Sequence, residues 1–245
     1  MQLSGFFITG TDTGTGKTAV GAALLYLMHS RGIRAAPVKP VQTGVAPGEP
    51  GDLEIYLKTS GLAPNADELS LMNPYRFRLP ASPHLAAETE GAAVDIQRIE
   101  RACRTLAESY QALVVEGAGG LLVPLSRSVS TLELVRRLKL PLLVVARAGV
   151  GTINHSLLTL KAAGDAGITV AALVLNRLPE PSGELPPEQV VEDNRKIIAR
   201  LSGAEVWEPL PHVSGAGEKV EATQKLACYL EKAGAGKLLE TFSGS

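Results

Sequence analysis

FFITGTDTGTGKTAVGAALLYL, residues 6–27, is the stretch that decides the fold of this chain. An apolar strand runs into a glycine-rich turn, and Gly-Lys-Thr then opens a helix. Glycine lets a backbone fold tightly, with its N–H groups pointing inward. Lys17 supplies a cation for terminal phosphates, the hydroxyl of Thr18 suits magnesium, and the helix amino terminus adds partial positive charge. The segment therefore predicts a loop that binds the phosphates of a nucleotide.

The spacing of this loop separates it from related loops. Five residues lie between Gly10 and Gly16, where four are usual, and Thr11 stands where the first glycine is expected. A surface turn with a chance Gly-Lys-Thr is the alternative, but strand, loop and helix follow in the required order. Partition and division-site ATPases carry a signature lysine at the position of Asp12. Asp12 therefore argues against an ATPase that switches by dimerisation.

The rest of the chain alternates short apolar runs with helix-like stretches. Strands are predicted at 6–9, 34–41, 112–116, 140–146, 170–176 and 204–210. Helices are predicted at 17–30, 52–60, 95–109, 131–137, 152–166, 187–201 and 222–232, with Ser130 and Glu133 as a capping box. This order predicts an α/β fold of the P-loop NTPase type, in which a parallel sheet has helices on both faces. Segments 44–51 and 177–189 read as loops, and residues 1–245 as a single domain.

Composition excludes several classes of protein. Hydrophobic residues make up 45% and the net charge is −1, so no overall field attracts nucleic acid or an anionic membrane. No apolar run is long enough to span a membrane, and residues 1–10 lack the pattern of a signal peptide. We therefore expect a cytoplasmic protein that binds neither nucleic acid nor membrane. Cys103 and Cys228 lack a metal-ligand spacing and are expected to be buried apolar residues.

A second lysine follows the strand predicted at 34–41. Lys39 lies in VKPVQTG (38–44), shortly before the hydroxyl of Thr43. The alternative is a solvated lysine at the edge of the sheet. Proline and glycine around Lys39 restrict the backbone and favour a functional role. If this strand lies near the first one, Lys39 lies near the phosphate loop, because ligands bind beyond the carboxyl ends of parallel strands.

Two acidic residues are candidate magnesium ligands. Glu116 ends a buried strand before Gly-Ala-Gly-Gly, and a carboxylate in that place needs a partner. The partner is either magnesium or its water shell, or else an arginine or lysine in a structural pair. Asp52 follows a Gly-Pro loop and offers a second oxygen ligand; alone it would be a helix cap.

Seven segments, in this order, are similar to those of one enzyme family. They are GTDTGTGKT (10–18), KPVQTG (39–44), NPYRFRLPASPHLAA (73–87), VEGAGGLLVPL (115–125), GVGTINHSLLTL (149–160), LNR (175–177) and LPHVSGAGE (210–218). Together they resemble dethiobiotin synthetase. The resemblance implies an ATP- and Mg²⁺-dependent ligase, and a homodimer. The implied substrates are ATP, 7,8-diaminononanoate and CO₂. Their product would be a cyclic urea, formed through a carbamic–phosphoric anhydride.

The resemblance also implies the role of each matching residue. Catalysis would fall to Lys17, Lys39 and Thr13, and magnesium to Thr18, Asp52 and Glu116. ATP would contact Gly14, Thr15, Gly16, Lys17, Thr18, Ala19, Asp52, Glu116, Gly117, Ala118, Gly119, Asn176, Arg177, Pro211, His212, Val213 and Glu218. Substrate would contact Lys39, Thr43, Gly151, Thr152, Ile153 and Asn154, the last four serving the partner subunit. Gly14 stands where members of the family often have a glutamate.

Two other functions compete with this interpretation. A regulatory P-loop ATPase switch that acts on a protein partner is the main alternative, and Asp12 argues against it. An amidating synthetase would need a glutamine-hydrolysing domain with a nucleophilic cysteine, for which the chain has no room. His84 and His155 are not assigned to catalysis, because amine and carbamate chemistry does not require a histidine.

Overall fold

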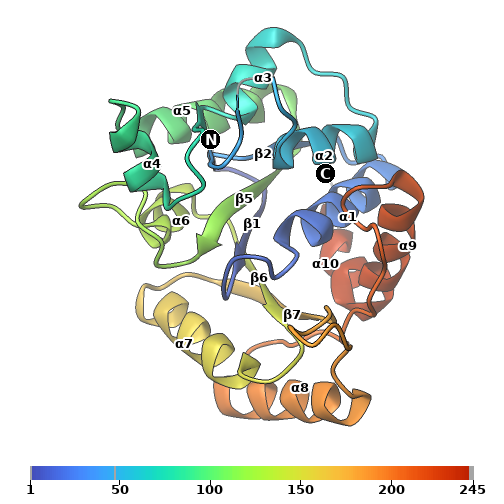
Figure 1. Ribbon diagram of the computed structural model, residues 1–245. Helices are drawn as coiled ribbons and strands as arrows, with labels where there is room; N and C mark the ends of the chain where they lie inside the picture. Colours follow the sequence, from blue (N-terminus) through green and yellow to red (C-terminus); the bar gives the residue numbers. More distant parts are fainter. Residues whose placement is uncertain (1, 47, 243–245) are drawn as a thin grey trace.

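The fold is built on one parallel sheet of five strands in the order β2-β5-β1-β6-β7 (Figure 1). The computed structural model describes residues 2–46 and 48–242. The five strands are β1 (Gly5–Gly10), β2 (Ala35–Val38), β5 (Ala112–Gly120), β6 (Leu142–Arg147) and β7 (Val170–Asn176). Every pair of neighbours in this sheet runs parallel. The predicted α/β fold class is confirmed.

Helices cover both faces of the sheet. One face carries α1 (Lys17–Ser30), α2 (Asp52–Ser60), α9 (Val220–Leu230) and α10 (Gly236–Leu239). The other carries α5 (Ile96–Ser109), α6 (Thr131–Leu138), α7 (Thr152–Asp165) and α8 (Glu188–Ser202). Strands covered on both faces are expected to be continuous apolar runs, which explains their lack of alternation with polar residues.

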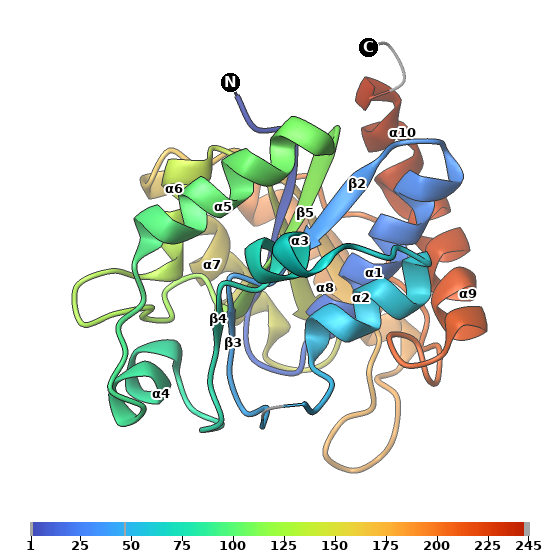
Figure 2. The same cartoon turned by 90° about the horizontal axis from the view of Figure 1, so that it is seen from above.

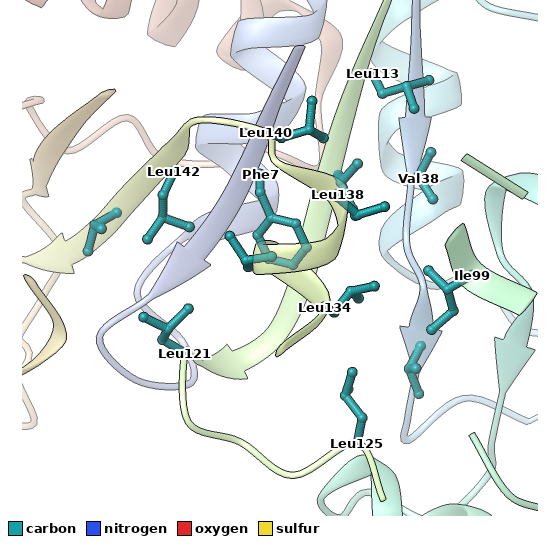
Figure 3. Packing of buried hydrophobic residues seen from close by; sticks show 14 of the residues in the cluster. Phe7, Val38, Ile99, Leu113, Leu121, Leu125, Leu134, Leu138, Leu140 and Leu142 are labelled. Atoms are coloured by element: carbon teal, nitrogen blue, oxygen red, sulfur yellow. The ribbon is translucent and has the colours of Figure 1, made fainter. Parts of the chain in front are cut away.

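Successive residues of one strand supply the two cores. Phe7 of β1 points to the core formed with α5 and α6, where it lies near Leu134 and Leu138 (Figure 3). Its neighbours Phe6 and Ile8 pack into the core formed with α1 and α9. Side chains alternate between the two faces of a strand, so a run such as FFIT fills both cores at once.

Several short elements were not predicted from the sequence. They are α3 (Ala66–Met72), α4 (Pro83–Thr89), α10, and a two-stranded parallel sheet of β3 (Val41–Gln42) and β4 (Tyr75–Arg76). The prediction of a strand at 204–210 was wrong. That segment makes only single bridges to β7, at Val206 and Leu210, and no strand is assigned to it.

Two smaller predictions were also wrong. Ser130 does occupy the N-cap of α6, but its side chain makes no capping hydrogen bond. The Glu133 carboxylate accepts hydrogen bonds from Arg136, three residues along the same helix. Cys103 is buried, and burial raises the pKa of its thiol to about 12, whereas the exposed Cys228 differs from the prediction.

Within residues 2–46 and 48–242, no helix is both long and apolar enough to cross a membrane.

Candidate active site

The phosphate loop joins the carboxyl end of β1 to the amino terminus of α1. Figure 2 shows the carboxyl ends of the strands on the side of the molecule that carries β3, β4 and α4. A cleft of about 860 Å³ lies there. Its walls include the phosphate loop, the segments after β2 and β5, the end of β7 and the loop before α9. The cleft lies at the edge of the sheet where the sequence predicted the site.

Lys17 is held inside the loop that precedes it. Its side chain is buried, and its Nζ donates a hydrogen bond of 3.0 Å to the backbone carbonyl of Asp12. Burial lowers the pKa of Lys17, and the nearby ammonium of Lys39 adds to this effect, while Glu116 opposes it. Gly16 adopts a left-handed conformation with φ of 89° at the N-cap of α1, which glycine does without strain. Residues of the loop, Lys17 among them, line the cleft.

Lys39 lies between two carboxylates. Its Nζ is 2.7 Å from Glu116 Oε1 and 2.6 Å from Asp52 Oδ2. Burial is the largest single influence on its pKa and lowers it, but the two carboxylates together outweigh burial, so the pKa is raised. Lys39 is therefore a buried, charged ammonium. The alternative of a solvated lysine at the sheet edge is wrong.

Glu116 contacts side chains from several elements that surround the cleft. Its side chain is 1% exposed, and Oε1 accepts a 3.0 Å hydrogen bond from the hydroxyl of Thr18 in addition to the contact with Lys39. Its other oxygen, Oε2, accepts a 2.8 Å hydrogen bond from the phenol of Tyr56. The structural pair with a lysine that the sequence left open is present. The same carboxylate also contacts the hydroxyl of Thr18, which the sequence assigned to magnesium.

Tyr56 was missed in the sequence. Burial and then the charge of Glu116 raise its pKa well above the ordinary value for a tyrosine, so the phenol stays protonated and donates its hydrogen. It lies four residues after Asp52 in α2, and residues at this spacing share one face of a helix. The four-residue spacing from Asp52 was the feature of the sequence that could have identified Tyr56.

The cleft gathers most of the residues that the sequence nominated. Those that line it are Thr13, Gly14, Gly16, Lys17, Thr18, Ala19, Lys39, Thr43, Asp52, Glu116, Ala118, Gly119, Asn176, His212, Val213 and Glu218. Residues that line it without having been nominated include Gln42, Ser82, Leu178 and Ala216. Asn176 donates a 3.1 Å hydrogen bond to the carbonyl of Thr15, which ties the end of β7 to the phosphate loop.

Other nominated residues lie outside the lining of the cleft. Thr15 is fully buried within the phosphate loop, and a Cβ at Gly117 would lie 3.0 Å from the ring of Phe7. The Arg177 guanidinium donates to the carbonyl of Pro186. Pro211 precedes the lining residues of the tail loop. The four residues assigned to the partner subunit, Gly151, Thr152, Ile153 and Asn154, lie at the start of α7 and do not line this cleft.

Two solved structures illustrate the similarity in fold. MinD cell division protein from Aquifex aeolicus is 15% identical, with a TM-score of 0.57 and 97% of each chain covered. A ParA family ATPase from Chlorobium tepidum TLS is 14% identical, with a TM-score of 0.56, covering 97% of this chain and 98% of the other. Identities this low speak for the fold alone. They give no support to the alternative of a regulatory switch.

Sequence comparisons identify the family. A model described as an AAA domain matches residues 4–219. A protein of Anaeromyxobacter sp. strain K, named ATP-dependent dethiobiotin synthetase BioD, is 44% identical over 211 residues, covering 84% of this chain and 92% of that relative. The protein of the same name from Bacillus cereus strain G9842 is 35% identical, covering 93% of this chain and 91% of that relative. Taken with the phosphate loop and the buried acidic–basic cluster beside it, these similarities show that the chain belongs to the ATP-dependent dethiobiotin synthetase family.

Proposed function

We propose that this chain is an ATP-dependent ligase that makes dethiobiotin from 7,8-diaminononanoate and CO₂. The observation that carries this proposal is the convergence of Lys17, Lys39 and Glu116 in one cleft at the phosphate loop. Two ammonium groups beside a loop of backbone N–H groups suit a reaction in which negative charge moves between a carbamate and a phosphoryl group.

The reaction needs positioning and charge stabilisation more than acid–base chemistry. One amine of the diamine takes up CO₂ as a carbamate, and a carbamate oxygen attacks the γ-phosphorus of ATP. The bond to the bridging oxygen breaks and ADP leaves. The second amine then attacks the carbonyl carbon and loses a proton, and phosphate departs as the ring closes. Lys39, buried and charged, would stabilise the carbamate and the transferring phosphoryl group, while Lys17 would hold the terminal phosphates.

The donor atoms near Thr18 fit a magnesium ion. Thr18 Oγ1 and Glu116 Oε1 are 3.0 Å apart, and the carboxylate of Asp52 reaches the same ammonium as Glu116. Hydroxyl and carboxylate oxygens are the ligands that Mg²⁺ prefers. Thr18, Asp52 and Glu116 would hold the ion, which would neutralise charge on the phosphates of ATP.

The two ends of the cleft suit the two organic substrates. Asn176, His212, Val213 and Glu218 line the end that we assign to the nucleoside. Thr43 lines the cleft directly after β3 and would contact the amine or carbamate of the diamine. Residues 151–154 at the amino terminus of α7 would receive the carboxylate of the diamine bound to a partner subunit, since helix amino termini attract anions. This assignment requires a homodimer. We infer that the enzyme works in the cytoplasm.

The test of this function is direct formation of the product. The protein is incubated with Mg-ATP, bicarbonate and 7,8-diaminononanoate, and dethiobiotin is measured by mass together with ADP and phosphate. We expect one dethiobiotin for each ADP, and none when ATP, magnesium or the diamine is omitted. ATP hydrolysis that is indifferent to the diamine, with no dethiobiotin, would contradict the proposal.

Glu116→Gln is expected to raise the magnesium concentration that gives half-maximal activity. Glutamine keeps one carbonyl oxygen, which can accept from Thr18 or from Tyr56, and removes the charge. Changes outside the ligand shell of a metal already cost about 10–100-fold in affinity, so we expect an increase of at least about 10-fold. Magnesium titrations of the initial rate measure it. Glu133→Gln, which alters an exposed carboxylate on α6, is the matched control. A titration curve that does not move would remove Glu116 from the metal site.

A further inference from the structure

Among the residues that the structure describes, the phenol of Tyr56 has one hydrogen-bond partner, Glu116. Tyr56 is 1% exposed and belongs to the apolar core beneath α1, where a phenylalanine would fill the same space. Its hydroxyl lies 2.8 Å from Glu116 Oε2. A buried hydroxyl costs free energy unless it is hydrogen-bonded, so apolar packing alone does not account for a tyrosine here.

The neighbouring helix leaves space for this hydroxyl. Gly21 lies on α1, and a Cβ at that position would be 1.9 Å from the hydroxyl oxygen of Tyr56. No side chain larger than hydrogen is compatible with the observed phenol. Glycine in the middle of a helix destabilises it relative to alanine. The fold therefore accepts a poor helix former in α1 at the point where the phenol reaches Glu116.

The two oxygens of Glu116 are divided between different partners. Oε1 faces Thr18 and Lys39, which belong to the catalytic side of the cleft. Oε2 faces only the phenol of Tyr56 among the hydrogen-bond donors of the described residues. Groups that hydrogen-bond the far oxygen of a ligating carboxylate orient it and tune its affinity for the metal.

We propose that Tyr56 is a positioning residue, which holds Glu116 so that Oε1 is presented to the metal of the nucleotide complex. The proposal rests on the proposed function in that it takes Glu116 as a magnesium ligand. Tyr56 acts through Glu116 and touches neither nucleotide nor metal. Loss of the Tyr56 hydroxyl is therefore expected to lower the affinity for the metal, with a smaller effect on kcat at saturating metal.

Tyr56→Phe tests this proposal by deleting only the hydroxyl. Binding of Mn²⁺, a spectroscopic substitute for Mg²⁺, is measured by electron paramagnetic resonance in the presence of ADP. We expect its dissociation constant to rise about 10-fold or more. The magnesium concentration for half-maximal dethiobiotin formation should rise in parallel, while kcat at saturating magnesium stays within about threefold of the unmodified enzyme.

Tyr110→Phe is the matched control. The phenol of Tyr110 donates a 2.9 Å hydrogen bond to Glu68 Oε1, but this pair lines a separate cavity that shares no lining residue with the cleft. Both variants remove one hydroxyl from a tyrosine–glutamate pair. Tyr110→Phe should leave the affinity for Mn²⁺ and the dependence on magnesium unchanged. An equal weakening in both variants would assign the effect to general destabilisation and overturn the proposal.

Gly21→Ala provides a second, independent route to the same contact. The added methyl group displaces the phenol from Glu116 while Tyr56 itself stays intact, so weakened Mn²⁺ binding is expected here too.

Unchanged Mn²⁺ affinity in Tyr56→Phe would overturn the role of Tyr56 even if dethiobiotin is formed. Weakened Mn²⁺–ADP binding would support that role even if no dethiobiotin is formed, so its failure and that of the proposed function are distinguishable.

Discussion

Replacing Lys39 with alanine is expected to lower the rate of dethiobiotin formation by about 10³-fold or more, because single donors to a developing oxyanion contribute about 10²–10³-fold. Lys39 is a full charge rather than a neutral donor, and it is nearly inaccessible to water. Among the described residues that line the cleft, the other lysine is Lys17, whose ammonium is bonded to the carbonyl of Asp12 within its own loop. Nucleotide binding should be largely retained. Steady-state assays and calorimetric titration with ADP separate the two effects.

The same substitution removes the partner of two carboxylates, so stability has to be measured beside activity. Breaking a buried ion pair by deleting one partner costs about 3–5 kcal/mol. Asp52 is 28% exposed and can be rehydrated, whereas Glu116 cannot, which places the expected loss near the lower end of that range. Lys161→Ala, which breaks an exposed pair with Asp165, should change neither property. Normal turnover by Lys39→Ala would remove Lys39 from the mechanism.

Lys17→Ala is expected to impair both nucleotide binding and turnover. A hydrogen bond to a charged group contributes about 1.5–3 kcal/mol, which corresponds to an increase of about 10–100-fold in the dissociation constant for ATP. Lys17 is buried in the phosphate loop, so alanine at this position removes the positive charge that the lysine supplies to the phosphates. Titration of each variant with ATP in the absence of the diamine measures the effect.

The contrast between the two lysine variants is the informative result. Lys17→Ala should fail at binding, and Lys39→Ala at the chemical step. If Lys17→Ala binds ATP as tightly as the unmodified protein, then the loop does not hold the phosphates through this side chain. Equal losses of affinity in both variants would mean that the two ammonium groups act only as a joint binding site.

Much of the fold could be predicted from the sequence, because the apolar runs that form its strands and helices can be recognised within each segment. The buried strands at 112–116 and 170–176 and the helix at 17–30 are strongly apolar and were placed within a few residues. The elements that were missed are short and half-exposed, such as α3 and α4. Segment 204–210 is apolar enough for a strand, but it lies beside the edge strand β7 and forms only two isolated bridges to it. Its ladder with β7 is interrupted at Pro209, which has no N–H, and Leu210 donates to the carbonyl of Leu175 instead.

The ion pairs of the site could not be predicted in the same way. Lys39 meets Glu116 because β2 pairs directly with β5, and no local pattern states the order of strands in a sheet. The sequence indicated that both residues follow buried strands, which placed them at one edge of the sheet. The contact between them, and the role of Tyr56 behind it, depend on pairings between segments more than 50 residues apart.

A crystal structure with Mg²⁺, a non-hydrolysable ATP analogue and 7,8-diaminononanoate would test the central claim most directly. The account predicts that the backbone of residues 10–18 surrounds the phosphates. It also predicts that Nζ of Lys17 and Nζ of Lys39 both lie within hydrogen-bonding distance of the terminal phosphate or the carbamate. A nucleotide bound elsewhere with this loop empty, or Lys39 turned away into solvent, would contradict it.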